Sequence, residues 1–181
     1  SPESEKSRRD DEALHQVTIN KPFYLGKYPV TQAQWQRVMG NSRSHSKGDN
    51  LPVEMVNCED CQEFIDKINR IAKTRNFRLP TEAEWEYACR AGTTTPFHFG
   101  SVCDGRQANC DGSHHQEISR KGPNLKEPSA VGSFDPNAWG IYDIHGNMWE
   151  WCSDRYAHYP NGTARDPTGP QEGHYRVLRG G

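Results

Sequence analysis

The chain has 181 residues, of which 33% are hydrophobic and 25% are charged, and its formal net charge is -2. This length predicts one domain, the near balance of charge argues against a nucleic-acid partner, and a mean hydropathy of -1.00 argues against a membrane partner or span. The 10% aromatic content argues against a chain that is disordered throughout. No leading apolar segment typical of a secretory signal is present, which slightly favours a cytoplasmic location.

The predicted elements crowd the first half of the chain. Residues 1–14 are polar and charged and are expected to be a mobile lead-in to one domain over residues 15–181. Alternating apolar residues predict short strands at His15–Ile19 and Phe23–Tyr28. Three helices are expected to follow, over Gln32–Met39, Cys58–Lys73 and Glu82–Arg90.

Each predicted helix carries its own boundary signals. Thr31, Asn57 and Thr81 stand at the expected N-caps, and a glutamate three residues after Thr81 suggests a capping box. Gly40 and Gly92 are expected to end the first and third helices. One face of the second helix is apolar and is expected to be buried; it comprises Cys61, Phe64, Ile65, Ile68, Ile71 and Ala72.

Residues 91–181 show no sustained period and predict loops, turns and short strands. This stretch holds Trp139, Trp149 and Trp151, which a solvated tail would not carry. We therefore expect a folded, loop-rich half that metal ions or disulfides hold together, the two usual devices where regular structure is scarce.

The segment between Asp143 and Glu150 is the densest in chemistry. Calcium takes six to eight oxygen ligands, which loops supply from carboxylates and backbone carbonyls. Asp143 and Glu150 offer carboxylates, and Gly146 lets the chain turn so that carbonyls near Gly146 and Met148 face inward. The alternative is an ordinary turn whose carboxylates are solvated or cap the backbone.

The six cysteines allow several interpretations. Cys58 and Cys61 form a CxxC motif at a helix start, but neighbouring acidic residues disfavour a thiolate and Cys61 lies on the apolar face, which favours a core role. Cys103 and Cys110 could bind zinc with the histidines that follow, His114 and His115, or could form a loop disulfide with each other. Cys89 and Cys152 are expected to be buried small side chains.

Five segments, in order, resemble the formylglycine-generating enzyme (sulfatase-modifying factor) domain family. They are residues 23–35 (FYLGKYPVTQAQW), 51–54 (LPVE), 78–92 (RLPTEAEWEYACRAG), 137–151 (NAWGIYDIHGNMWEW) and 176–181 (RVLRGG). The resemblance implies an α+β, C-type-lectin-like fold, loop-rich with few short strands and about three helices. It also implies that the domain is incomplete here, lacking the family's first strand and its C-terminal segment.

The resemblance further implies calcium. In the family, one ion is held by the segment that matches this one, with side-chain oxygens from Asp143 and Glu150 and carbonyls from Gly146 and Met148. A second family calcium site uses an asparagine that aligns with Asn109 and an acidic residue further along, where this chain has Pro123 beside Asn124.

Two functions are compatible with the resemblance. The family's enzymes are copper-dependent oxidases that convert a substrate cysteine to formylglycine, and their two copper-binding cysteines follow the match to Gly180 and Gly181. Copper is therefore expected only if that C-terminal segment is supplied, and no catalytic residue is assigned. The alternative is a non-catalytic module that binds a protein or peptide ligand, as in retroelement-diversified variable proteins of this fold.

Overall fold

The structure is a computed structural model that describes residues 14–112, 122–159 and 162–181. Its described elements confirm the expected α+β architecture with short strands and long loops. No helix within these ranges is long and apolar enough to cross a bilayer. In chain order the elements are β1 (Val17–Thr18), α1 (Gln32–Met39), α2 (Cys58–Ile71), α3 (Glu82–Arg90), β2 (Glu150–Arg155), β3 (Ala164–Arg165) and β4 (Arg176–Arg179).

Local capping explains where the helices begin. The side chains of Thr31, Asn57 and Thr81 each accept a hydrogen bond from the third helical N–H, and the side chain of that third residue accepts a bond from the backbone N–H of the cap residue. The predicted bounds of α1 and α3 are confirmed. The predicted end of α2 at Lys73 is wrong, because Lys73 has a φ of +51° and the helix stops at Ile71.

Two details of the predicted ends and faces also differ. The residue that caps α3 in the left-handed conformation is Ala91, one position before the expected Gly92. On α2, Phe64 and Ile65 are buried as predicted, whereas Ile71 is 68% exposed because it lies at the end of the helix.

The structure contains less strand near the N-terminus than the sequence predicts. The first strand is limited to Val17–Thr18. Residues 23–28 form no strand: Tyr24 is fully exposed, and the Lys27 carbonyl accepts a single bond from Tyr142 rather than joining a ladder. Apolar alternation alone could not show that this segment has no neighbouring strand to pair with.

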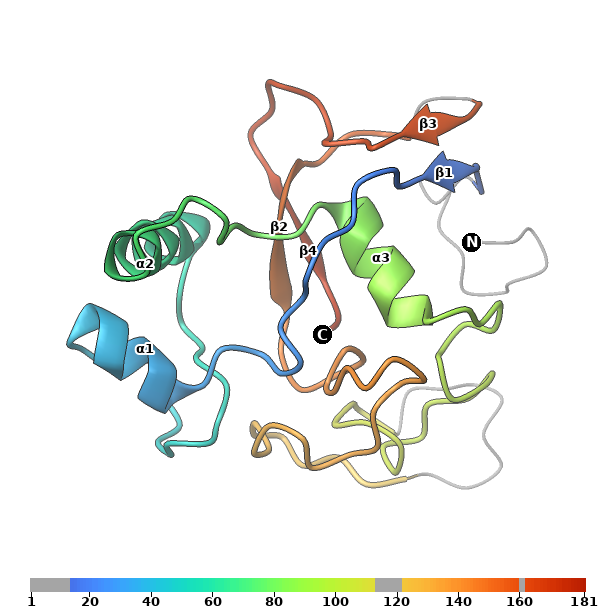
Figure 1. Cartoon of the computed structure of the whole chain (residues 1–181). Helices are drawn as coiled ribbons and strands as arrows, with labels where there is room; N and C mark the ends of the chain where they lie inside the picture. The colour runs from blue at the N-terminus through green and yellow to red at the C-terminus, as the bar shows by residue number, and fades with distance from the viewer. Residues whose placement is uncertain (1–13, 113–121, 160–161) are drawn as a thin grey trace.

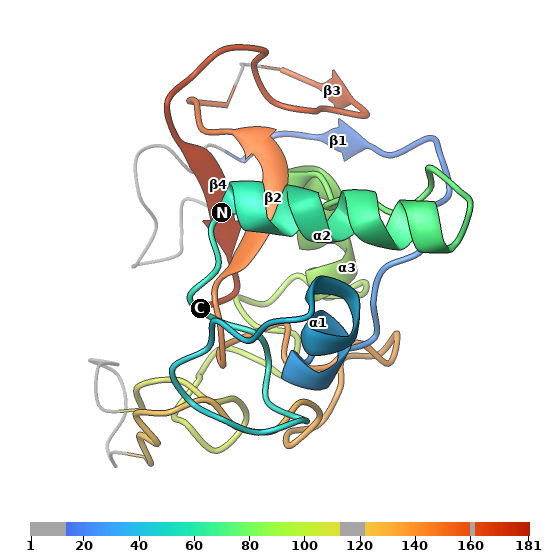
Figure 2. The same ribbon diagram turned by 90° about the vertical axis from the view of Figure 1, so that its left-hand side faces the viewer.

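Two small sheets organise the rest. β2 and β4 pair antiparallel, with Glu150 opposite Arg179 and an irregularity after Trp151, whereas β1 and β3 pair in parallel. Figures 1 and 2 show the β2–β4 ribbon between α2 on one side and α3 on the other, with the loops of residues 91–112 and 122–148 gathered beyond the end of α3.

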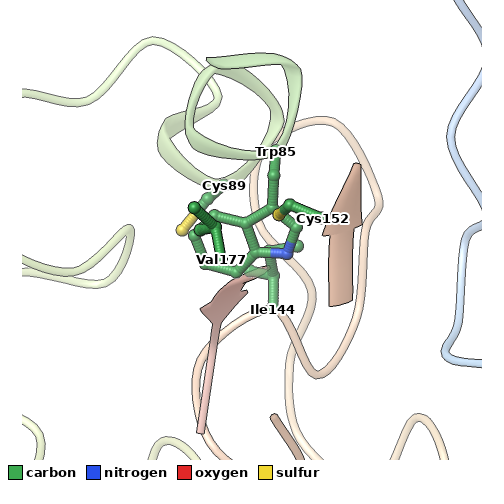
Figure 3. Close-up of a cluster of buried hydrophobic side chains, with 5 residues drawn as sticks. All are labelled: Trp85, Cys89, Ile144, Cys152 and Val177. Carbon is green, nitrogen blue, oxygen red and sulfur yellow. The ribbon is translucent and has the colours of Figure 1, made fainter. Parts of the chain in front are cut away.

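Buried side chains form two clusters. Trp35 stacks on Phe64 at a ring separation of 5.1 Å and joins α1 to α2. The other cluster lies beneath α3, where it meets β2 and β4 (Figure 3), and consists of Trp85, Cys89, Ile144, Cys152 and Val177. The predicted burial of Cys89 and Cys152 is confirmed.

Candidate functional site

Asp143 is a buried carboxylate in the loop that leads into β2. Its Oδ2 accepts a hydrogen bond from the N–H of Gly132 at 2.7 Å, while its Oδ1 is buried without a hydrogen-bond partner. Burial raises the pKa of Asp143, and the Gly132 bond opposes that rise. A buried, unpaired oxygen is costly, so Oδ1 of Asp143 is suited to accept a hydrogen bond or to bind a cation.

Glu150, the first residue of β2, is the second carboxylate of this loop. Its Oε2 accepts a hydrogen bond from the Trp85 indole at 2.9 Å. Burial raises the pKa of Glu150 to about 7, and the negative charge of Asp143 acts in the same direction. The two carboxylates therefore lie close enough to repel each other when both are ionised.

The backbone between these carboxylates is held by neighbouring loops. The N–H of Gly146 donates to the Gly180 carbonyl at 2.6 Å, and the Gly146 carbonyl accepts from Met148 at 2.8 Å. The N–H of Asn147 donates to the Asn109 carbonyl at 2.8 Å. The Asn109 side chain donates to Asn147 Oδ1 at 3.2 Å and to the Glu127 carbonyl. Asn109 thus supports the loop from the side.

The fit to calcium can be judged from these contacts. A hard cation is bound by carboxylate and carbonyl oxygens, and the unpartnered Oδ1 of Asp143 together with the destabilised charge of Glu150 suits such an ion. No group of three or more His, Cys, Asp or Glu side chains in the described ranges could hold a metal, so carbonyl oxygens would have to complete the ligand set. The assignment of Asp143, Gly146, Met148, Glu150 and Asn109 as calcium ligands stays a prediction.

A cleft of about 1410 Å³ opens beside α3. Its walls come from α3, the loop of residues 93–98, the β1–β3 pair and the end of β4. These segments are far apart in the chain, and Figure 1 shows them around α3. Polar side chains that line the cleft include Glu82, Glu86, His98, His145, Tyr159 and Arg179.

An ionic network covers the α3 side of the cleft. The Arg179 guanidinium donates to Glu86, lies 3.5 Å from Glu82 and sits 5.0 Å from the centre of the Trp85 ring. The Tyr159 hydroxyl donates to Glu82 at 2.7 Å. Burial raises the pKa of Glu82, and the Tyr159 bond and Arg179 limit that rise. The network fixes acidic side chains of α3 to the last strand.

A histidine corner closes another side of the cleft. The His145 Nε2 lies 3.4 Å from the Cys89 Sγ, and the His98 ring stacks on His145 with the ring centres 5.2 Å apart. Burial lowers the pKa of His145 to about 4, and His98 acts in the same direction. His98 Nδ1 is buried without a hydrogen-bond partner. Both of these pKa effects favour the neutral His145 ring, which lies beside the Phe97 and Phe99 rings.

The thiols separate into distinct environments. Burial raises the pKa of Cys61 to about 12, with Cys58 and an adjacent aspartate adding to the rise, which is the opposite of an activated CxxC thiol. The Sγ atoms of Cys103 and Cys110 lie 2.8 Å apart. The suggested zinc site with His114 and His115 falls partly outside the described residues.

The sequence did not point to the cleft. Glu82 and Glu86 stand one turn apart on α3, a spacing that could have marked an acidic stripe. Nothing in the sequence shows that Arg179 meets this stripe, because the two partners in the Arg179–Glu86 bond are 93 positions apart.

The fold and site define a loop-rich α+β domain with a cleft beside one helix and a loop that carries the buried Asp143 and leads to the half-buried Glu150. The chain belongs to the sulfatase-modifying factor enzyme 1-like domain family, whose sequence profile matches residues 2–181. It is 33% identical over 178 residues to the formylglycine-generating enzyme of Mus musculus, a match that covers 93% of this chain and 44% of the mouse protein. The chain thus spans less than half the length of that relative.

Two solved structures share the fold. Variable protein 1 of Treponema denticola superposes with a TM-score of 0.81 at 28% identity, over 92% of this chain and 75% of that one. PvdO of Pseudomonas aeruginosa superposes with a TM-score of 0.81 at 26% identity, over 99% of this chain and 76% of that one.

Proposed function

We propose that this domain binds an extended peptide or protein segment in the cleft beside α3, on a scaffold that calcium stabilises at Asp143 and Glu150. The observation that carries the proposal is the cleft itself, about 1410 Å³ and bounded by segments from both ends of the described chain. A concave site with apolar walls and a few placed polar groups is the usual form of a ligand site.

The lining supplies the contacts that a peptide needs. The histidine corner at His98 and His145, with its phenylalanines, offers apolar and aromatic surface. α3 and the end of β4 present the network of Glu82 and Glu86 with Arg179, whose side chain is 30% exposed. A bound backbone could reach these charges while its side chains contact the aromatic rings.

The proposed site has two parts, the loop that would hold the cation and the cleft that would hold the peptide. Calcium, when bound, would supply a positive charge that offsets the negative charges of Asp143 and Glu150. Asp143 and Glu150 would hold it, and the Gly146 turn would keep the loop against Gly180 at the edge of the cleft. The Trp85 indole orients Glu150 by its hydrogen bond, so the cation loop and α3 keep a fixed relation.

A variant that fills the cleft tests this proposal. Thr94 is exposed and lines the cleft, whereas Thr18 is exposed but is not part of the lining. The probe is a labelled, extended peptide with a central cysteine, followed by fluorescence anisotropy. We expect Thr94→Trp to weaken binding by about tenfold or more, equivalent to about 1.4 kcal/mol, and Thr18→Trp to bind as the parent does. Equal affinity for both variants, or no binding to the folded parent, would contradict the proposal.

A second candidate is oxidation of a cysteine in the bound peptide to formylglycine. The observation that favours it is the similarity to the mouse enzyme across 93% of this chain. Because the family's copper-binding cysteines follow the match to Gly180 and Gly181, the test uses the chain extended by that C-terminal segment. Incubation of the extended chain with the cysteine peptide, oxygen and copper(I), followed by an aldehyde-reactive hydroxylamine probe, separates the two functions. Labelling of the cysteine peptide but not of its serine counterpart supports the oxidase, and binding of both peptides without labelling supports the module.

A further inference from the structure

Cys103 and Cys110 stand out among the thiols because their sulfur atoms face each other. The two Sγ atoms lie 2.8 Å apart, and the residues are seven positions apart in the chain. A disulfide has an S–S length of about 2.05 Å, so a bridge requires only a small movement of two side chains. The buried Cys103 and the partly buried Cys110 both line the cleft.

The backbone between the two cysteines is already fixed in a turn. Ala108 in this turn is 3% exposed, and its carbonyl accepts a bond from the Cys110 N–H at 2.9 Å. Gly105 has a φ of +81°, and a Cβ there would lie 2.2 Å from the Pro123 carbonyl oxygen. The turn therefore presents the two sulfurs to each other without a large rearrangement, which lowers the entropy lost when they are joined.

The same turn supports the loop that carries Asp143 and Glu150. The Asn109 carbonyl, next to Cys110, accepts the N–H of Asn147 at 2.8 Å. A Cβ on Gly146 would lie 2.5 Å from the same oxygen, so the two backbones are in close contact. Any bond that stiffens the turn at 103–110 also stiffens the surface against which residues 146–147 rest.

We propose that Cys103 and Cys110 are a dithiol–disulfide pair, and that their bridge fastens the 103–110 turn beneath the Gly146–Asn147 segment. The oxidant is a low-molecular-weight disulfide of the glutathione class. The Cys110 thiolate attacks it, forms a mixed disulfide and releases one thiol. Cys103 then loses its proton to solvent, attacks the Cys110 sulfur and releases the second thiol. The protein gives up two protons and two electrons, and the small disulfide becomes two thiols.

The surroundings predict which step is slow. Burial raises the pKa of Cys103 to about 12, with the hydrogen bond to Cys110 adding to the rise. The partly exposed Cys110 therefore meets the oxidant first, and closure by Cys103 becomes faster as the pH rises because more of it is ionised. Cys89 differs from this pair: burial raises its pKa to about 12, and its Sγ contacts the His145 ring rather than another sulfur.

The test uses the full chain equilibrated in glutathione buffers of defined ratio, with EDTA present throughout so that calcium plays no part. Free thiols are then trapped with an alkylating reagent and the protein is digested with trypsin without reduction. Arg106 lies between the two cysteines, so trypsin cuts inside the turn and the two peptides stay joined only if the bridge exists. We expect this joined pair in oxidising buffer and its loss in reducing buffer.

A stability measurement tests the second half of the proposal. A bridge over a loop this short is expected to raise the Tm by about 5–10 °C between reduced and oxidised protein. Cys110→Ser should abolish the shift, and Cys58→Ser, the matched control, should keep it. A joined pair without a Tm shift overturns the fastening role, and the absence of the joined pair at every glutathione ratio overturns the bridge. Neither outcome depends on peptide or calcium binding, so failure here and failure of the proposed function are distinguishable.

Discussion

Replacement of Gly146 by alanine is the sharpest probe of how the two loops meet. Gly146 has a φ of +77°, and an added Cβ would lie 2.5 Å from the Asn109 carbonyl oxygen and 2.9 Å from its carbonyl carbon. The left-handed backbone costs an L-residue about 1–2 kcal/mol. The clash with a packed backbone adds about 1–3 kcal/mol, typical of an overfilled site. The total expected loss of unfolding free energy is about 2–5 kcal/mol.

Gly140 provides a matched control within the same half of the chain. It has the same φ of +77°, but no atom lies within 4 Å of its added Cβ. Gly140→Ala should therefore lose only the backbone contribution, about 1–2 kcal/mol. The difference between the two variants, about 1–3 kcal/mol, isolates the contact between Gly146 and Asn109.

Thermal unfolding followed by circular dichroism measures this difference. In a chain of this size each kcal/mol shifts the Tm by about 2–4 °C, so Gly146→Ala should melt several degrees below Gly140→Ala. The measurement is made in EDTA so that changes in ion binding do not contribute. Equal Tm values for the two variants would refute the close contact, and with it the support of the 143–150 loop by the turn at Asn109.

Two further perturbations test the charges. The pKa of Glu84 is held below its usual value mainly by the Arg78 hydrogen bonds, at 2.6 and 2.7 Å. The stability that ionised Glu84 contributes to the folded state is therefore present above the unfolded carboxyl pKa of about 4.5, and it is lost as the pH falls. In urea titrations, Glu84→Gln should have a lower free energy of unfolding than the parent at pH 7, and this difference should shrink in acid. A difference that does not change with pH would refute the pairing of Glu84 with Arg78. Calcium at about 100 times its Kd should stabilise the parent by about 2.7 kcal/mol, and Glu150→Gln should lose this response. Equal Tm values of the parent in calcium and in EDTA would contradict the cation site.

The helices could be predicted because their signals are local. Thr31, Asn57 and Thr81 bond to atoms three residues away, so each cap is fully encoded in a few adjacent positions. The strands could not be predicted in this way, since pairing of residues such as Val17 with Ala164 depends on distant neighbours. Residues 23–28 have the composition of a strand but no ladder partner in the structure.

The candidate site divides along the same line. Asp143 and Glu150 are close in sequence, so the proximity of their carboxylates could be expected from the spacing and from the family resemblance. The ionic network could not, because Arg179 reaches α3 from the last strand. The sequence also led us to expect that metal ions or disulfides replace regular ladders in the second half. The structure shows that a β2–β4 ladder contributes as well, with Glu150 opposite Arg179.

This register joins the two halves of the site. Glu150 faces the cation loop and bonds to Trp85, while its ladder partner Arg179 sits over the same Trp85 ring and bonds into the cleft network. A cation that fixes Glu150 would therefore also restrict the position of Trp85 and Arg179. Since coupling between two binding equilibria is reciprocal, a peptide that engages Arg179 should tighten calcium binding by the same factor as calcium tightens peptide binding. Peptide affinities that are identical in calcium and in EDTA would show that the shared indole does not transmit the effect.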